Sequence, residues 1–579
     1  EKSDTLNKFN YDKYFLKRNE IKKIVNRISF FRLLIFISII ISFILGAKVD
    51  IFNIIGVILI FAFIMLIYIH DRYYKQLNYY EKYLNILNQY KDRDNGNWKK
   101  FKDTGEEYSS ELFMDLNIVG DNSLFQYLSV CKTKGGRDVL IDKLSNKKIN
   151  DKELLKNQEA IKELASNVDF DVNFLVAMGC FDGKLIDLKD NFSLLDRKIG
   201  NKYFDIIVGL LFSSLCIIFL LLGLFNVISY NYFIGIFIFN FLINFMYESI
   251  FHEDFSNIDK ISSDYYKLNE VYEVIVNTKF TSSKLNSISK DISIDIDKIK
   301  YLFFINDLNN LKNNILSSSI FNGLFCINIA VMFMYSLFLK KDVNTLKVGI
   351  SDIEEMEALI SLAGIGILKK NVCMPILVDD VELDFKNIEH PLISSGKVVA
   401  NDFSNTAGVN IITGSNMGGK TTFIRTVGIN LILMNAGTFV CSTNFKSCYF
   451  RIFTSISVTD NIDKGISTFY GELLRMKKAI DFHGGNRLVL VDEIFKGTNY
   501  NDRIYGAINV IKKLDDSKTM LFVTTHDFEL CDYKIKNLRN YYFKEYYEGD
   551  SIKFDYKLRE GKCESTNAKY LMKKLNIID

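Results

Sequence analysis

Two regions of the chain contain long stretches without any charged side chain. Near the N-terminus these are Leu33–Ala47 and Ile51–Ile69, separated by Lys48–Asp50. Further on, Ile206–Tyr247 is uncharged throughout, with polar residues near Asn226–Asn231. About 20 helical residues cross the roughly 30 Å hydrocarbon core of a bilayer, so each region predicts a transmembrane hairpin of two helices. A buried core helix is the alternative, but soluble helices seldom stay uncharged on every face.

The charges beside the first hairpin predict its orientation. Residues 1–32 contain nine Lys and Arg against four acids, and Arg72 and Lys75 follow the second apolar run. Because basic flanks stay in the cytoplasm, we expect both ends of the hairpin inside, in an integral protein of the cytoplasmic membrane. Residues 76–115 are expected to be helical and polar, then loop-like.

From about residue 378 the pattern changes to short β-rich runs that alternate with helices. Val409–Thr413, Leu488–Val491 and Met520–Thr524 are typical of buried parallel strands. Two further elements are expected in the tail: a strand at Ser551–Leu558 and a short closing helix at Asn567–Leu575. This alternation predicts an α/β domain.

The first of these strands leads into a candidate phosphate loop. Gly414, Gly419, Lys420 and Thr421 fit the pattern G-x-x-x-x-G-K-[ST], and a helical pattern follows. Glycines let backbone N–H groups surround phosphate oxygens, Lys420 would reach the β- and γ-phosphates, and the Thr421 hydroxyl would ligate Mg²⁺. The motif therefore predicts ATP and Mg²⁺. A chance Gly-rich turn is disfavoured by the strand and helix on either side.

Two acids end the next predicted strand. Asp492 would hold Mg²⁺ through water, and Glu493 would orient or polarise the attacking water. An acidic strand end at a turn is the alternative, which the upstream phosphate loop makes the weaker one. His526 follows the third strand and would sense the γ-phosphate, although a capping or core histidine is also compatible with the pattern.

Ser467 precedes an amphipathic helical pattern. It is a plausible N-cap of that helix, or a contact that this helix N-terminus offers to a phosphate of a partner subunit. A third apolar run, Ile315–Leu339, could span a membrane by length. A fifth span would put the phosphate loop outside, away from ATP, and Asn322 and Asn328 interrupt the run, so we expect a buried core helix or strand instead.

The overall composition excludes only a few kinds of site and partner. The chain has 72 basic and 69 acidic residues among 579, a balance that points to no particular partner. Its nine cysteines contain no C-x-x-C spacing. This argues against a zinc site and against a disulfide framework, and fits a reducing compartment.

Several motifs together resemble the MutS family of DNA mismatch repair ATPases. The C-terminal ones are Gly414–Thr422, Ser467–Phe469, Asp492–Asn499, Thr525–Leu530, His390–Leu392, Val398–Asp402 and Phe554–Gly561 with Ser565–Lys574; the upstream ones are Ser123–Gln126, Lys134–Arg137, Asn157–Ile161 and Ile353–Ala363. The resemblance covers roughly residues 115–579, interrupted by the second hairpin. It implies an α/β P-loop (ABC-type) ATPase domain on a mostly helical MutS-like core.

The resemblance also implies site residues and an assembly. Expected cofactor contacts are Gly414, Ser415, Asn416, Met417, Gly418, Gly419, Lys420, Thr421, Thr422 and Asn401; expected catalytic residues are Glu493, His526 and Ser467; expected metal ligands are Thr421 and Asp492. Family members work as dimers with two composite ATP sites, on which Ser467 would act from the partner. A homodimer is therefore expected.

The chain also departs from the family pattern. Its first hundred residues offer no mismatch-recognition domain and no Phe-x-Glu wedge, and Lys496 stands where many members carry Arg. We therefore expect a membrane-anchored MutS-like ATPase with a clamp-like cycle, which would bind double-stranded DNA through backbone contacts as the family does. The alternative is an ATP-driven membrane machine or scaffold that moves its hairpins without DNA.

The expected domain layout follows the same order along the chain. It comprises 1–75 (basic N-terminus and first hairpin), 76–202 (first part of the core), 203–250 (second hairpin), 251–377 (second part of the core), 378–545 (ATPase domain) and 546–579 (dimerisation element).

Overall fold

The structure is a computed structural model of the chain. It describes residues 11–179, 187, 189, 199–200, 202–311, 315–341, 343–394, 396–415, 417–456, 468–548 and 551–562. The closing helix expected at Asn567–Leu575 lies outside these ranges. The chain forms two compact units: the first comprises 1–130, 140–172 and 359–579, and the second comprises 131–139 and 173–358. The six-part layout expected from the sequence stays a prediction.

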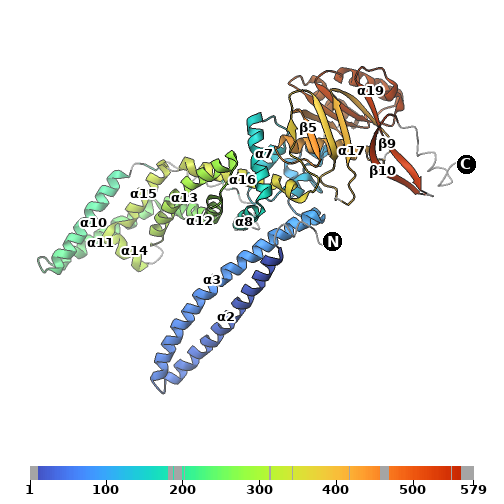
Figure 1. Ribbon diagram of the computed structural model, residues 1–579. Helices are drawn as coiled ribbons and strands as arrows, with labels where there is room; N and C mark the ends of the chain where they lie inside the picture. The colour runs from blue at the N-terminus through green and yellow to red at the C-terminus, as the bar shows by residue number, and fades with distance from the viewer. Residues whose placement is uncertain are drawn as a thin grey trace. The chain divides into compact units, whose positions relative to one another are not determined.

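The first unit begins with two long helices that pack against each other, α2 (Tyr11–Gly46) and α3 (Ile51–Asp94) (Figure 1). The two N-terminal apolar runs lie inside them, joined by the short turn expected at Lys48–Asp50. Only 6% of the most apolar window of each helix is buried. A helix whose apolar side chains face outward needs an apolar medium or a partner to cover them.

The ATPase-like part of the first unit is built on a six-stranded sheet in the order β10-β9-β4-β8-β7-β6. The members are β4 (Gly408–Thr413), β6 (Arg451–Ser455), β7 (Arg487–Asp492), β8 (Thr519–Thr524), β9 (Leu538–Glu548) and β10 (Ser551–Glu560). Neighbours pair in parallel except β9 and β10. Every residue of β4 and β8 is buried, which explains why these strands read as continuous apolar runs.

Helices α17 (Lys420–Asn435), α18 (Thr468–Asp481) and α19 (Tyr500–Leu514) pack on this sheet. Phe522 of β8 contacts both Phe423 of α17 and Phe403 of β3. β3 (Asn401–Thr406) belongs to a second sheet with β1 (Ile376–Leu377), β2 (Glu382–Ile388) and β5 (Asn444–Ser447), in the order β1-β5-β2-β3. Aromatic rings thus fill the space between the two sheets.

Three further helices of the first unit follow α3 along the chain. They are α4 (Glu111–Asp115), α5 (Leu124–Leu128) and α7 (Asp151–Ser166). Arg475 of α18 reaches the fully buried Asp115 at 2.7 Å, which ties the end of α4 to the ATPase-like part. The structure also describes α6 (Lys134–Leu144), α8 (Val168–Met178) and α16 (Val343–Leu368).

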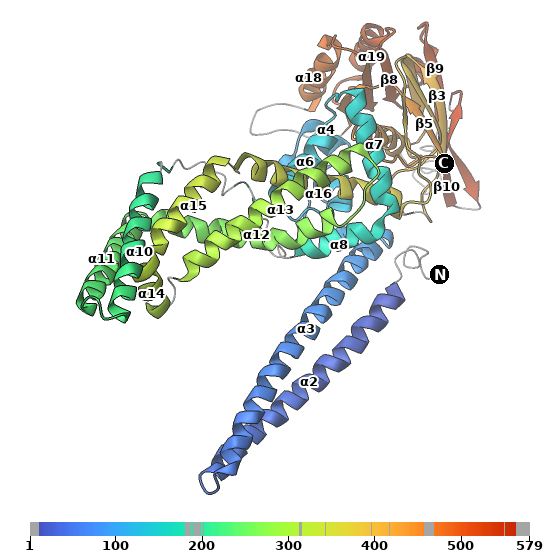
Figure 2. The ribbon, with the colours of Figure 1, turned by 60° about the vertical axis from the view of Figure 1, so that its left-hand side comes forward.

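The second unit is helical in the part that the structure describes. α10 (Tyr203–Leu224) and α11 (Tyr230–Ile250) form the second hairpin, with the turn where the sequence placed it. α12 (His252–Val276) and α13 (Ser283–Asn310) lie side by side in both views (Figure 2). Among the described residues four helices are long and apolar enough to cross a membrane: α2, α3, α10 and α11.

The third apolar run differs from the single helix or strand that we expected. It forms two helices, α14 (Ile315–Phe325) and α15 (Ile327–Lys341), bent by 77° at Cys326, whose φ is 49°. The side chain of Asn322 accepts the N–H of Asn328 at 3.1 Å across the bend. A left-handed residue ends a helix, and this side-chain cap stabilises the break. If the bent pair counts as one span, the candidate spans number up to five.

The bent pair packs against the second hairpin through buried amides. Asn240 of α11 donates to the Gly323 carbonyl at 3.0 Å, and Asn328 donates to the Glu248 carboxylate of α11 at 3.0 Å. α15 also buries Val331, Met332 and Phe338. The expectation that this run is part of a core therefore agrees with the burial of α15.

Candidate functional site

The candidate site lies where β4, β7 and β8 end side by side. The loop 414–419 leaves β4 and leads into α17. Gly414 has φ +138°, and a Cβ atom there would lie 2.7 Å from the carbonyl oxygen of Phe543, so only glycine fits. Gly419 has φ +100° at the helix N-cap. The loop thus turns tightly onto the N-terminus of α17, as a phosphate-binding loop must.

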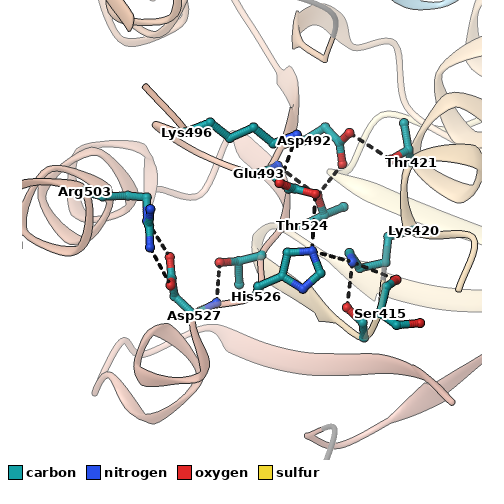
Figure 3. Close-up of polar contacts among 12 residues, drawn as sticks. Ser415, Lys420, Thr421, Asp492, Glu493, Lys496, Arg503, Thr524, His526 and Asp527 are labelled. Carbon is teal, nitrogen blue, oxygen red and sulfur yellow. Dashed lines mark hydrogen bonds and ion pairs between the residues drawn. The ribbon is translucent and has the colours of Figure 1, made fainter. Parts of the chain in front are cut away.

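Lys420 is the first residue of α17 and is buried. Its ammonium donates to the carbonyl oxygens of Gly414 at 2.6 Å and Ser415 at 3.0 Å, and lies 3.3 Å from Nε2 of His526 (Figure 3). An ammonium needs such oxygen partners when it is buried. The charge is therefore held inside the loop that would surround the phosphates.

Asp492 at the end of β7 joins two other segments. Its carboxylate accepts the Thr421 hydroxyl of α17 at 2.8 Å and the Thr524 hydroxyl of β8 at 2.5 Å. Thr524 also accepts the N–H of Glu493 at 3.0 Å. Thr524 was not singled out from the sequence, because only the pairing of β7 with β8 brings it to the acids.

Glu493 adopts an unusual backbone conformation, with φ 51°. Its carboxylate lies 3.3 Å from His526 and 2.9 Å from Lys496. The hydrogen bond from His526, with further help from Lys496, lowers the pKa of Glu493 to about 2 against the opposing effect of burial. Nε2 of His526 either donates to Glu493 or accepts from Lys420, since one ring nitrogen cannot do both.

A cavity of about 380 Å³ lies beside the loop. It is lined by Ile388, His390, Ile393, Lys397, Val398, Val399, Asn401, Gly419, Thr422, Phe423, Thr426, Phe543 and Tyr556. The stretches His390–Leu392 and Val398–Asp402, which resemble MutS motifs, thus contribute residues to the cavity wall. Phe543 and Tyr556 were missed, because they come from β9 and β10 and no local pattern assigns them to this wall.

His390 is a buried member of this wall. Its Nδ1 accepts the N–H of Leu392 at 3.2 Å, which leaves the proton of the neutral ring on Nε2. Burial, with the nearby charges of Arg425 and Lys369, lowers the pKa of His390 to about 4. The ring is therefore neutral at physiological pH.

The structure brings most of the expected site residues together. Lys420, Thr421, Asp492, Glu493 and His526 meet within hydrogen-bonding distances. Gly414, Ser415, Met417, Gly418 and Gly419 form the described part of the loop, where Met417 is 74% exposed, and Thr422 lines the cavity. Asn416 and Ser467 lie outside the described residues.

Asn401 lies at the cavity, but its side chain is bound elsewhere. Its amide donates to the Tyr556 carbonyl at 3.0 Å and accepts the N–H of Leu558 at 2.7 Å. It therefore joins β3 to β10 and shapes the wall.

The donor set at the strand ends fits a magnesium ion. Within the part of the chain that the structure describes, no group of three or more His, Cys, Asp or Glu could hold a metal. Mg²⁺ needs less, because it usually takes one or two protein ligands and fills the remaining positions with water and phosphate oxygens. Thr421 and Asp492, already 2.8 Å apart, are two oxygen donors of the right kind.

These features define an ATPase-type α/β domain: a parallel sheet, a Gly-rich loop on a helix N-terminus, and acids at the neighbouring strand end. Comparison with known proteins gives the family. Residues 410–574 match MutS domain V. Residues 410–574 therefore belong to the MutS domain V family.

Individual relatives match over part of their length. The DNA mismatch repair protein MSH3 of Vanderwaltozyma polyspora is 34% identical over 250 residues, 40% of this chain and 24% of that protein. Endonuclease MutS2 of Clostridium novyi is 29% identical over 41% of this chain and 31% of its own. The DNA mismatch repair protein MutS of Natronomonas pharaonis is 30% identical over 37% of this chain and 26% of its own. The chain thus spans about a quarter to a third of these relatives.

The buried neutral His390 predicts how stability depends on pH. Its pKa is lowered from 6.5 to about 4 in the folded protein, so between these values the unfolded chain binds the proton and the folded chain does not. Stability should therefore fall by up to about 3 kcal/mol as pH drops from 6.5 to 4. His390→Asn keeps an acceptor for Leu392 and should remove this part of the loss. Unfolding midpoints across this range measure it.

The control is His483→Asn, at an exposed histidine. It should leave the pH dependence as in the wild type. An unchanged pH dependence in His390→Asn would contradict a buried neutral imidazole.

Proposed function

We propose that this chain hydrolyses ATP with Mg²⁺ at the strand-end site. One observation carries the proposal: side chains from three separate segments converge there. Lys420 and Thr421 come from the loop and α17, Asp492 and Glu493 from the end of β7, and His526 from the loop after β8. Phosphoryl transfer needs a buried ammonium, a hydroxyl, a carboxylate that holds the metal and a carboxylate that orients the attacking water.

Each residue has a role that follows from its contacts. Lys420 exchanges the carbonyl oxygens of Gly414 and Ser415 for phosphate oxygens. Glu493 stays ionised at neutral pH, because its pKa of about 2 lies far below, and so orients a water molecule by accepting its hydrogen bond. Mg²⁺, when bound, neutralises charge on the β- and γ-phosphates. His526 senses the γ-phosphate from between Lys420 and Glu493.

The cavity would take the adenine and ribose. Its wall combines apolar side chains, such as Val398 and Phe543, with the neutral ring of His390. Ligand sites are commonly built this way, with a few polar groups in an apolar wall. The position of this cavity next to Gly419 and Thr422 suits a base attached to phosphates in the loop.

The working unit would be a homodimer with composite sites, as the MutS resemblance implies. Ser467 would reach the ATP of the partner subunit. The helix that follows it supports an interface, because Tyr470, Leu473 and Leu474 of α18 are exposed. Residues 546–579 would contribute the dimerisation element, and ATP binding would close the two ATPase domains on each other.

We further propose that α2, α3, α10 and α11 anchor the chain in the cytoplasmic membrane, with the ATPase domain in the cytoplasm. Their outward apolar side chains and the basic flank at residues 1–32 support this. The end of α3 is tied to α5 in the first unit: buried Arg93 donates to the carbonyls of Tyr127 at 2.8 Å and Ser129 at 2.7 Å.

Two outputs of ATP turnover remain as candidates. The family resemblance favours a clamp that binds double-stranded DNA through its phosphates. A specific contact route favours a membrane machine: Lys369 lies over the ring of Tyr127, near Arg93, and donates to the carbonyl of the cavity residue Ile393 at 3.3 Å. A chain of contacts through Tyr127 and Lys369 thus links the end of the first hairpin to the cavity proposed for the nucleotide.

The ATP assignment predicts two different defects. Lys420→Ala should weaken ATP binding severely, because it removes the buried positive charge. Glu493→Gln should bind ATP but lose turnover and accumulate a closed dimer, because it keeps the shape and removes the carboxylate. Fluorescent-nucleotide binding and phosphate release measure the two steps. Lys446→Ala on β5 is the control and should behave as wild type; wild-type turnover by Glu493→Gln would contradict the role of this residue.

The membrane assignment predicts which sites a membrane-impermeant thiol reagent reaches in intact cells. In a background without the nine native cysteines, Val49→Cys and Asn231→Cys should be labelled from outside. Lys13→Cys, Lys260→Cys and Lys340→Cys should be labelled only after lysis. Outside labelling at position 340 would mean that α14 and α15 together form a fifth span.

The DNA clamp predicts affinity that depends on phosphate contacts. Binding by the detergent-solubilised protein should fall steeply with salt, and should differ little between paired and mismatched duplexes at fixed salt. Competition binding tests this. A preference of about tenfold for the mismatch, roughly 1.4 kcal/mol, would reveal a mismatch reader. Absence of DNA binding together with ATP turnover would favour the membrane machine.

A further inference from the structure

A forked ion pair lies beside the strand-end site. Arg503, in the first turn of α19, donates from Nε to Asp527 Oδ2 at 2.8 Å and from Nη2 to Asp527 Oδ1 at 3.0 Å (Figure 3). Both side chains are largely shielded from solvent, with 26% and 13% exposed. Two parallel bonds between a planar guanidinium and a carboxylate fix direction as well as distance.

The carboxylate partner is one residue from His526. The segment leaves β8 at Thr524 and is held by two hydrogen bonds. The N–H of Thr525 donates to the Ile412 carbonyl at 3.1 Å, and the N–H of Asp527 donates to the Thr525 hydroxyl at 3.0 Å. The two hydrogen bonds from Arg503 to Asp527 hold the backbone on the C-terminal side of His526. The backbone that carries the imidazole is thus fixed both before and after it.

The orientation of the His526 imidazole depends on this backbone. Its side chain is 41% exposed, and Nε2 lies 3.3 Å from both Lys420 Nζ and Glu493 Oε1. These long contacts restrain the ring weakly, because hydrogen bonds weaken with distance. A shift of the loop would therefore move Nε2 away from both groups.

The other end of the fork is also rigid. Asn499 caps α19 by accepting the N–H of Asp502 at 3.0 Å, and its carbonyl accepts the N–H of Arg503 at 3.0 Å. α19 begins a few residues after Glu493, on the same connection from β7. Arg503 therefore links the segment that carries Glu493 to the segment that carries His526.

We propose that Arg503, through Asp527, is a positioning residue that holds His526 between Lys420 and Glu493 for ATP hydrolysis. This rests on the ATPase function proposed above. Arg503 does not touch the nucleotide in this arrangement. Its effect is on the chemical step, and substrate binding is left to the loop and the cavity.

The first test compares turnover with binding in the full chain. Arg503→Ala should lower kcat by about tenfold, while ATP affinity changes less than about twofold, since a displaced catalytic group costs rate more than binding. Arg503→Lys keeps the charge without the fork and should recover part of the loss. Asp527→Asn keeps the shape and should behave like Arg503→Lys.

The decisive test is a double-mutant cycle with His526→Ala. If Arg503 acts through His526, then Arg503→Ala should change kcat by less than about twofold once the imidazole is absent. If Arg503 had only a structural role, Arg503→Ala would lower kcat by the same factor in the His526→Ala variant as in the wild type. Additive losses, or wild-type kcat in Arg503→Ala, would overturn the proposal.

A second arginine–aspartate ion pair, joined by one hydrogen bond, serves as the control. Asp516 pairs with Arg487 at 2.5 Å at the opposite ends of β7 and β8. Asp516→Ala should leave kcat unchanged; an equal loss there would indicate a general effect of removing an ion pair and overturn the assignment. If Arg503→Ala does not fold, Arg503→Lys and Asp527→Asn carry the same cycle. Failure of the wild type to bind or hydrolyse ATP would instead refute the ATPase function itself.

Discussion

The carboxylate of Asp492 is the contact on which the candidate site depends. It accepts hydroxyls from Thr421 and Thr524, residues that lie 71 positions upstream and 32 positions downstream. Those two bonds align the start of α17, the end of β7 and the end of β8 at one edge of the sheet. Because the parallel register brings all three ends to the same edge, the loop, the acids and His526 become neighbours.

This alignment explains why charged groups tolerate burial here. Lys420 is 3% exposed, and its charge is compensated by two carbonyl oxygens of the loop. Glu493 is stabilised as an anion by His526 and Lys496. A site that is already charged and hydrogen-bonded has little to reorganise when charge develops on a substrate. The strained backbone of Glu493, with φ 51°, lies at the same place, where such strain commonly marks function.

Outside the site, the first unit combines an enclosed apolar core with helices whose apolar side chains are exposed. The ATPase-like part packs rings such as Phe403 and Phe522 between its two sheets, whereas the apolar stretches of α2 and α3 expose rings such as Phe31 and Phe61. Within the first unit, Arg93 ties the end of α3 to α5 by donating to the carbonyls of Tyr127 and Ser129. In the second unit, buried asparagines rather than apolar contacts alone join α11 to the bent pair α14 and α15. Buried amides need specific partners, so they fix one arrangement of these helices.

The sequence by itself determined the elements whose cause is local. Uncharged runs gave the helices of both hairpins, unbroken apolar runs gave β4, β7 and β8, and the glycine and lysine spacing located the loop. Only the tertiary structure decided the bend at Cys326, the engagement of Asn401 by β10, and the presence of Thr524, Phe543, Tyr556 and Arg503 around the site. Periodicity reports which face of an element is buried. It carries no information about which distant segment supplies the partner, and each of these features depends on such a partner.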